Sequence, residues 1–133
     1  MAKSVYLFLA IFLSLTTTQA YACRCNQPSM QEAYDASALV VQANVSDFAS
    51  MPSGEGNVAI LKTKQTWKGQ ALDKISVISL TNCHFSWEVD KQYIVFLHEE
   101  SNGMYSTDKC MGNVSGEEGE SAVRWLEENS MSK

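Results

Sequence analysis

The sequence is short of basic residues, of histidine and of long apolar runs. Ten lysines and arginines stand against fifteen aspartates and glutamates, which gives a formal net charge of −5, and there are two histidines. A chain this acidic lacks the basic surface that binding to nucleic acid or to anionic lipid requires. We therefore expect no nucleic-acid partner.

The longest apolar run, over residues 5–15, is shorter than the roughly 20 residues that a membrane-spanning helix needs. It follows one positive charge and precedes Ala20 and Ala22, which place small residues at the −3 and −1 positions of a cleavage site. This layout predicts a secretory signal peptide over residues 1–22, with Cys23 as the first residue of the mature chain. We expect a secreted or periplasmic protein without a membrane anchor after cleavage.

Residues 23–133 suffice for one compact domain and are too few for two. We expect a monomer that needs no cofactor. The alternative is a lipoprotein whose Cys23 is acylated after cleavage. It is less favoured because Ala20 and Tyr21 stand where such signals usually carry leucine and a small residue.

The four cysteines and two histidines lack the C-x-x-C and H-x-x-x-H spacings of zinc sites. An even number of cysteines in a small exported domain predicts two disulfides. Cys23 and Cys25 are poorly placed to bridge each other, because residues two apart in an extended strand point the same way with Cα atoms ~6.6 Å apart. One is expected to pair with Cys83 and the other with Cys110, in either arrangement.

Catalytic motifs are also missing. No serine lies in the G-x-S-x-G context of a nucleophile elbow. His84 adjoins Cys83, His98 ends a predicted strand, and paired cysteines leave no thiol for Cys-His catalysis. We therefore expect no enzymatic activity.

Hydrophobic periodicity and turn residues predict a mainly β domain. Strands are expected over residues 38–45, 57–67, 75–80, 92–98 and, more briefly, 104–107. Capping boxes predict one helix from Ser29, with Glu32, and another from Ser115, with Glu118, running to Asn129. Five strands with a helix on each side fit a five-stranded barrel of the oligonucleotide/oligosaccharide-binding (OB) type. Periodicity alone does not separate this barrel from a sandwich.

A cysteine at the first mature position has chemical interest of its own. A disulfide at Cys23 would hold a free α-amino group beside the carbonyl of the same residue, and these two atoms can chelate a metal in a five-membered ring. The pKa of an α-amino group is near 8, so it loses its proton readily near neutral pH. The alternative is that Cys23 serves only as a disulfide partner.

A series of short segments matches one known family in order and spacing. The segments are Cys23-Arg24-Cys25, Pro28, Gln31-Glu32-Ala33-Tyr34, residues 38–43 (ALVVQA), residues 62–69 (KTKQTWKG), Asn82-Cys83 and residues 91–95 (KQYIV). The series resembles the tissue inhibitors of metalloproteinases, in particular their N-terminal netrin-like module, over most of residues 23–110. The chain resembles a single-domain member, without the family's cysteine-rich C-terminal subdomain.

This resemblance implies an OB fold over residues 23–133 and the disulfides Cys23–Cys83 and Cys25–Cys110. It also implies that the Cys23 amino and carbonyl groups bind the catalytic zinc of a target metalloprotease, so that Cys23 is a metal ligand only in the complex. Arg24 would enter the S1′ pocket. The neighbouring subsites would be filled by Cys25, Asn26, Thr81 and Asn82.

The chain departs from the family at several positions. Asp35 replaces a third cysteine, Arg24 replaces a small threonine or serine, and Asn26 and Gln27 are not the usual residues. Most matrix metalloproteinase S1′ pockets are apolar, and burying an unpaired guanidinium there is unfavourable. The alternative function is therefore a netrin-like module that binds another extracellular protein without contacting zinc.

Overall fold

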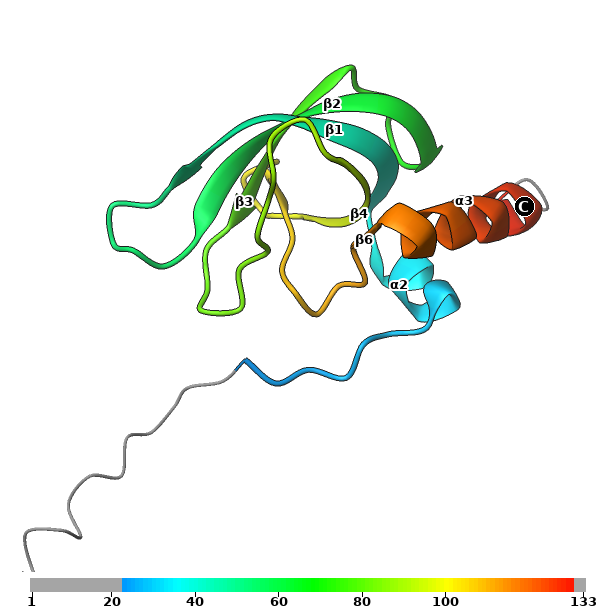
Figure 1. The fold of residues 1–133 in the computed structure, drawn as a ribbon, viewed down its shortest axis with the longest axis horizontal. Coiled ribbons are helices and arrows are strands. Elements are labelled where there is room, and N and C mark those ends of the chain that lie inside the picture. The colour runs from blue at the N-terminus through cyan, green and yellow to red at the C-terminus, as the bar shows by residue number, and fades with distance from the viewer. Residues whose placement is uncertain (1–22, 131–133) are drawn as a thin grey trace, which may run out of the picture.

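The computed structural model describes residues 23–130, so the signal peptide predicted over residues 1–22 lies outside the described residues. Figure 1 shows the strands curled into a barrel, with both helices on one side of it. Within this part of the chain, no helix is long and apolar enough to cross a membrane. The elements in chain order are α2 (Met30–Ala36), β1 (Leu39–Ser50), β2 (Asn57–Lys68), β3 (Lys74–Ser79), β4 (Gln92–Glu99), β5 (Tyr105–Ser106), β6 (Val114–Ser115) and α3 (Gly116–Ser130).

The strands close into a ring in the order β1-β2-β3-β5-β4, and the pairing of β4 with β1 completes it. β3 and β5 run parallel, whereas the other pairs in the ring are antiparallel. β6 pairs with Tyr93 and Ile94 of β4, whereas β5 pairs with His98 and Glu99 of the same strand. The prediction of a mainly β, OB-fold-like five-stranded barrel with a short N-terminal helix, a C-terminal helix and two disulfides is confirmed.

Alternating apolar residues fill the inside of the barrel. Successive strand residues point to opposite faces, so every second residue of β1 and β4 faces inward. The inner cluster, each member at most 4% exposed, comprises Leu39, Val41, Ala43, Val45, Ala59, Leu61, Ile75, Val77, Trp87, Tyr93, Val95 and Leu97. Burial of this apolar surface is the main force that closes the barrel.

One buried amide fastens the long β3–β4 connection to the barrel. The Trp87 indole donates to Asn57 Oδ1 at 3.0 Å, and Asn57 Nδ2 donates to the Phe85 carbonyl at 2.8 Å. The rings of Phe85 and Trp87 meet edge to face at 4.6 Å between centroids. The connection that carries Thr81, Asn82 and Cys83 therefore leaves the barrel from a fixed base.

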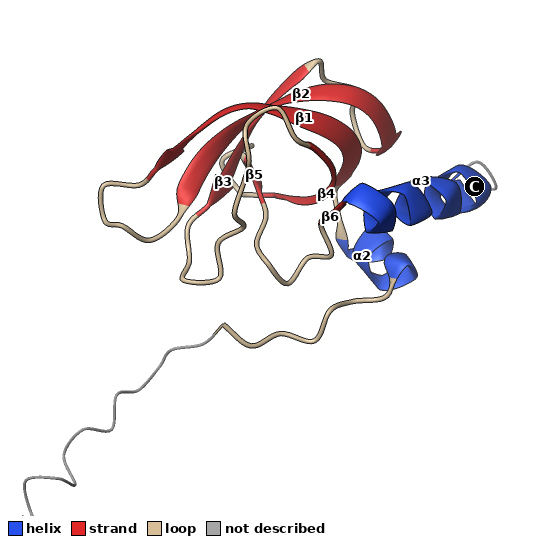
Figure 2. Cartoon of the chain, viewed as in Figure 1, coloured by secondary structure: helices blue, strands red, loops and turns tan. Residues whose placement is uncertain are grey.

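The two helices cover the outer face of β1 and β4 (Figure 2). Val40, Ile94 and Phe96 point outward and are at most 2% exposed. Against them pack Ala33 and Tyr34 of α2 and Ala122 and Leu126 of α3. In each helix the packing residues recur at helical spacing, as predicted. The predicted capping box of α2 is present, with Ser29 Oγ accepting from the Glu32 N–H and the Glu32 carboxylate accepting from the Ser29 N–H.

The loop before β6, residues 107–113, is tied to β4 by two polar side chains. Asn113 Oδ1 accepts from the Phe96 N–H at 2.8 Å, and Asn113 Nδ2 donates to Thr107 Oγ1 at 2.7 Å. Thr107 Oγ1 in turn donates to the Phe96 carbonyl at 3.0 Å. This network fixes the loop that carries Cys110.

Two details of the strands differ from the expectation. β1 continues five residues past Val45 to Ser50, and residues 47–50 are exposed. β6 was not predicted, because its two residues form a strand only by pairing with Tyr93 and Ile94. Both segments owe their strand conformation to a neighbouring strand, since neither carries an alternating apolar pattern.

Candidate functional site

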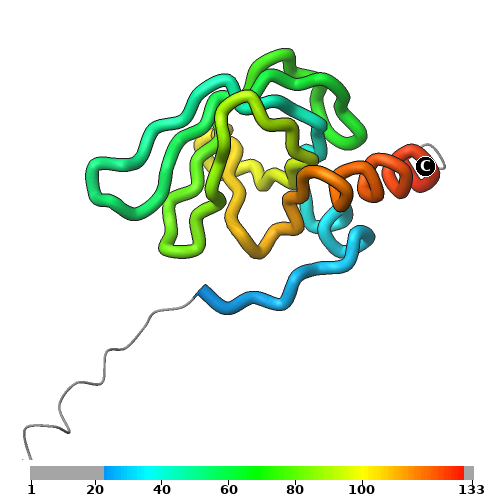
Figure 3. The backbone as a smooth tube through the Cα atoms, viewed as in Figure 1, coloured from blue at the N-terminus to red at the C-terminus, as the bar shows by residue number. Residues whose placement is uncertain are grey.

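The candidate site is the N-terminal segment, defined as residues 23–27. It has no regular secondary structure; Cys23 is half-buried and residues 24–27 are exposed. Figure 3 shows this segment in blue, running below the loop that follows β3 and the loop that precedes β6. An extended stretch of this kind lies outside the barrel and depends on those loops for its conformation.

Two disulfides attach the segment to these loops. Cys23 bonds to Cys83 with 5.3 Å between Cα atoms, and Cys25 bonds to Cys110 with 5.5 Å. Residue spacing left both arrangements open, and the observed one is the arrangement that the family resemblance implies. Since the loops they close span 60 and 85 residues, the chain-entropy model gives each bond a stabilisation of ~4 kcal/mol.

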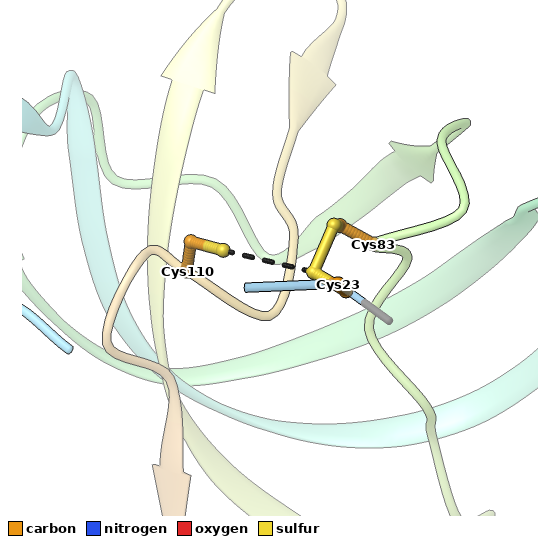
Figure 4. A group of neighbouring side chains, drawn as sticks. All are labelled: Cys23, Cys83 and Cys110. Atoms are coloured by element: carbon orange, nitrogen blue, oxygen red, sulfur yellow. Dashed lines mark hydrogen bonds between the residues drawn. A yellow bond between two sulfur atoms is a disulfide. The ribbon is translucent and has the colours of Figure 1, made fainter. Parts of the chain in front are cut away.

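The two disulfides touch each other. Cys23 Sγ lies 3.9 Å from Cys110 Sγ, as the dashed line in Figure 4 marks. Sulfurs in disulfides carry no proton, so this approach is a van der Waals contact. The sulfurs of Cys23, Cys83 and Cys110 lie within 4.8 Å of one another, yet no cysteine among the described residues is a free thiol. The oxidised cluster therefore lacks the thiolates that a metal would need.

One backbone and one side-chain hydrogen bond tie the two cysteine loops to each other and to the segment. The Lys109 N–H donates to the Cys83 carbonyl at 2.9 Å, and Gln27 Nε2 donates to the Lys109 carbonyl at 3.0 Å. Gly112, at φ +95°, brings the Cys110 loop against Pro28, since a Cβ there would lie 3.3 Å from Pro28 Cγ. The segment is thus attached at Cys23, at Cys25 and at Gln27, and the chain is held again directly after it at Pro28.

The β3–β4 loop forms a tight turn beside Cys23. Thr81 Oγ1 accepts from the Cys83 N–H at 3.1 Å, and the Thr81 carbonyl accepts from the His84 N–H at 3.0 Å. Thr81 and Asn82 are both exposed at this turn. The Cys23–Cys83 bond therefore brings together all the residues predicted to contact a target: Cys23, Arg24, Cys25, Asn26, Thr81 and Asn82.

Two cationic residues lie at the segment. An open hollow of about 550 Å³ is lined by Cys23, Arg24, Cys25, Asn26, Gln27 and Lys109, with no acidic residue among them. Arg24 and Lys109 are both exposed. Sequence reasoning missed Lys109; the available signal was its position next to Cys110, one of the two cysteines expected to meet the N-terminus.

The two histidines do not form a site. His98 is exposed at the end of β4, while the His84 ring Nδ1 lies 3.0 Å from the Thr81 carbonyl in the turn beside Cys83. The three tryptophans are packing residues, as expected. Trp87 is 4% exposed in the inner cluster, and Trp67 and Trp125 pack partly buried against the outer one.

No protein-family model matches the chain, and no curated protein matches it. The assignment to the tissue inhibitors of metalloproteinases therefore stays a prediction. It rests on the sequence segments quoted above.

Proposed function

We propose that the protein is a secreted inhibitor of a zinc metalloprotease, related to the tissue inhibitors of metalloproteinases, and that it acts by occupying the active site. In this proposal the mature chain begins at Cys23. Its α-amino nitrogen and carbonyl oxygen bind the catalytic zinc of the target and displace the water that attacks the substrate. The protein itself performs no reaction.

The observation that carries the proposal is the Cys23–Cys83 disulfide. It attaches the residue that would hold the metal to a loop that is itself fixed to the barrel through Asn57 and Trp87. A chelating group held in place before binding loses little conformational entropy when the complex forms. A free peptide with the same first five residues lacks this advantage.

The exposure of residues 24–27 also supports an active-site ligand. Arg24 follows Cys23 directly and projects from a segment without regular structure. An extended segment of this kind fits a protease cleft, which binds substrates in extended form. Thr81 and Asn82, exposed on the adjoining turn, supply a second strip of contacts.

The test compares two mature proteins, one beginning at Cys23 and one carrying an extra alanine before it. Against a panel of zinc metalloproteases, the first is expected to inhibit at least one member. The second is expected to be at least about 100-fold weaker, because its Cys23 nitrogen is an amide and no longer a basic amine. A protein with the extra alanine at the C-terminus is the matched control and should inhibit like the first. Equal inhibition by both N-terminal forms contradicts chelation by Cys23.

The pH dependence of inhibition provides a second readout. Only the deprotonated amine binds zinc, and an α-amino group ordinarily has a pKa near 8. Below that value the inhibition constant is expected to fall by about tenfold for each unit of rising pH. The inhibition constant of the alanine-extended form should show no such pH dependence, because its Cys23 nitrogen is an amide.

One observation favours a second candidate, a netrin-like module that binds an extracellular protein without contacting zinc. Arg24 carries a charge where the resembled family has a small residue. The substitution Arg24→Thr separates the candidates. It should strengthen inhibition of matrix metalloproteinases if the protein is an inhibitor, and it should leave them uninhibited if the protein is a binding module.

A further inference from the structure

The guanidinium of Arg24 has no anionic partner within the described residues. The salt bridge found in this part of the chain joins Lys91 to Glu88, so no carboxylate lies within 4.0 Å of Arg24. Two carboxylates on adjoining segments, one in α2 and one in the Cys110 loop, accept hydrogen bonds from other groups. Glu32 accepts from the Ser29 N–H at 2.7 Å, and Asp108 accepts from the Cys110 N–H at 2.7 Å.

Lys109 places a second cation on the same hollow. Its carbonyl accepts from Gln27 and its N–H donates to Cys83, so its backbone is fixed against the N-terminal segment while the residue stays exposed. The chain as a whole is acidic, with a net charge of −5. The proposed inhibitory surface therefore has the opposite sign to the protein as a whole.

A charge of this kind decides which protease cleft the segment can enter. An arginine buried in an apolar S1′ pocket would lose its hydration without gaining a partner. A carboxylate in the pocket changes the balance, because guanidinium and carboxylate form paired hydrogen bonds of matching geometry. Such a pocket also selects substrates with arginine or lysine after the cleaved bond.

We infer that the target is a zinc metalloprotease with an acidic S1′ pocket, one that cleaves peptides on the N-terminal side of arginine or lysine. Arg24 is the specificity-determining residue, and Lys109 meets a second acidic position at the rim of the same cleft. This inference rests on the proposed function, since Arg24 reaches S1′ only when Cys23 is at the zinc.

The experiment uses the mature protein and two zinc metalloproteases, each assayed with a peptide substrate. One cleaves before arginine and has a carboxylate in S1′; the other cleaves before leucine and has an apolar S1′. Wild type is expected to inhibit the first at least about 100-fold more strongly than the second. Arg24→Leu should reverse this preference, and Lys109→Gln should weaken inhibition of the first about five- to tenfold without affecting the second.

Lys74→Gln is the matched control, because it removes an exposed lysine at the start of β3, the end remote from Thr81. It should leave both inhibition constants unchanged. One outcome is that both proteases are inhibited, that Arg24→Leu changes neither inhibition constant, and that the N-terminal alanine abolishes inhibition. This outcome overturns the specificity inference and leaves the proposed function standing. If neither wild type nor Arg24→Leu inhibits either protease, the specificity inference and the proposed function are both overturned.

Discussion

Inside the barrel, the inner cluster is stabilised mainly by apolar burial, whereas residues 24–27 are all exposed and are held by the disulfides of Cys23 and Cys25. The two regions meet in the loops that carry Cys83 and Cys110. The difference separates two tasks within one small domain. Burial of apolar side chains selects the fold, and the disulfides fix the conformation of residues 24–27, which bury no side chain in the core.

This separation has a measurable meaning. Substitutions in distant, independent regions add in their effects on stability, whereas residues that share contacts do not. A change in the barrel should therefore alter the free energy of unfolding alone, whereas removal of a disulfide should lower the free energy of unfolding and also reduce the local order of residues 24–27.

The largest effect is expected from Phe96→Ala. Phe96 is fully buried between β4 and the helices, so its removal leaves a cavity and should lower the free energy of unfolding by about 3–5 kcal/mol. Urea denaturation measures this loss. Leu80→Ala, at a residue that is 48% exposed, is the control and should change stability by less than about 0.5 kcal/mol. Equal losses in the two variants would contradict the burial assigned to Phe96.

The next effect is expected from the paired change Cys23→Ser with Cys83→Ser. It should lower the free energy of unfolding by about 2–4 kcal/mol while the far-ultraviolet circular dichroism of the barrel is retained. Backbone order parameters of residues 24–27, measured by nitrogen-15 relaxation, should fall below about 0.6. The pair Cys25→Ser with Cys110→Ser is the matched comparison. Loss of the strand spectrum in either variant would show that the barrel itself needs the disulfides.

Asn57→Ala tests the attachment of the β3–β4 connection, which carries Cys83, to the barrel. It leaves the Trp87 indole N–H and the Phe85 carbonyl without their partner, and we expect a loss of about 1–3 kcal/mol in urea denaturation. Amide exchange in residues 80–85 should accelerate as well. Ser53→Ala, in the exposed β1–β2 turn, is the control and should be close to neutral. A neutral Asn57→Ala would mean that the loop is held mainly by Cys83.

The smallest effect is expected at the start of α2. Ser29→Ala removes the side-chain cap and should lower the free energy of unfolding by about 1 kcal/mol. Hydrogen bonds from the Ser29 backbone N–H and then from its hydroxyl lower the pKa of Glu32 below 4.5. The stabilisation from Glu32 is therefore present above pH 4.5 and is lost as the pH falls through the folded-state pKa.

Carbon-13 titration of the Glu32 carboxyl group checks this direction. In Ser29→Ala the pKa should move part of the way back toward 4.5, because the backbone hydrogen bond remains. A Glu32 pKa at or above 4.5 in the wild type would contradict the observed capping box. Ser101→Ala, in an exposed loop, serves as the control.

Apolar, β-branched runs and one alternating segment, residues 57–67, explain why most of the barrel could be predicted. Residues 38–45 and 92–98 are apolar and β-branched, and the structure has strands over Leu39–Ser50 and Gln92–Glu99. The strand order could not be read in this way, since the parallel pairing of β3 with β5 rests on two residue pairs, Val77 with Tyr105 and Ile78 with Ser106. Those contacts depend on where the β4–β5 turn, residues 100–104, returns the chain.

The candidate site was predictable to the extent that cysteines mark it. Cys23 and Cys25, beside a predicted cleavage site, indicated that the N-terminal segment would be tied to Cys83 and Cys110. Spacing could not choose between the two pairings, because both close loops of similar length. The contact between Lys109 and Gln27 could not be predicted, since the two residues are 82 apart in the chain and meet through a backbone carbonyl; only the position of Lys109 next to Cys110 pointed to this part of the molecule.

The amide of Asn113 has a consequence for the biosynthesis of the protein. Asn113-Val114-Ser115 matches the acceptor sequence for N-linked glycans, which are attached to the asparagine Nδ2. That nitrogen donates to Thr107 Oγ1 and to the Asp108 carbonyl, so a glycan on it would replace at least one of these two hydrogen bonds. A glycan added during synthesis would therefore weaken the docking of the Cys110 loop on β4. Producing the protein in an export pathway without N-glycosylation, or as Ser115→Ala, avoids this competition between sugar transfer and folding.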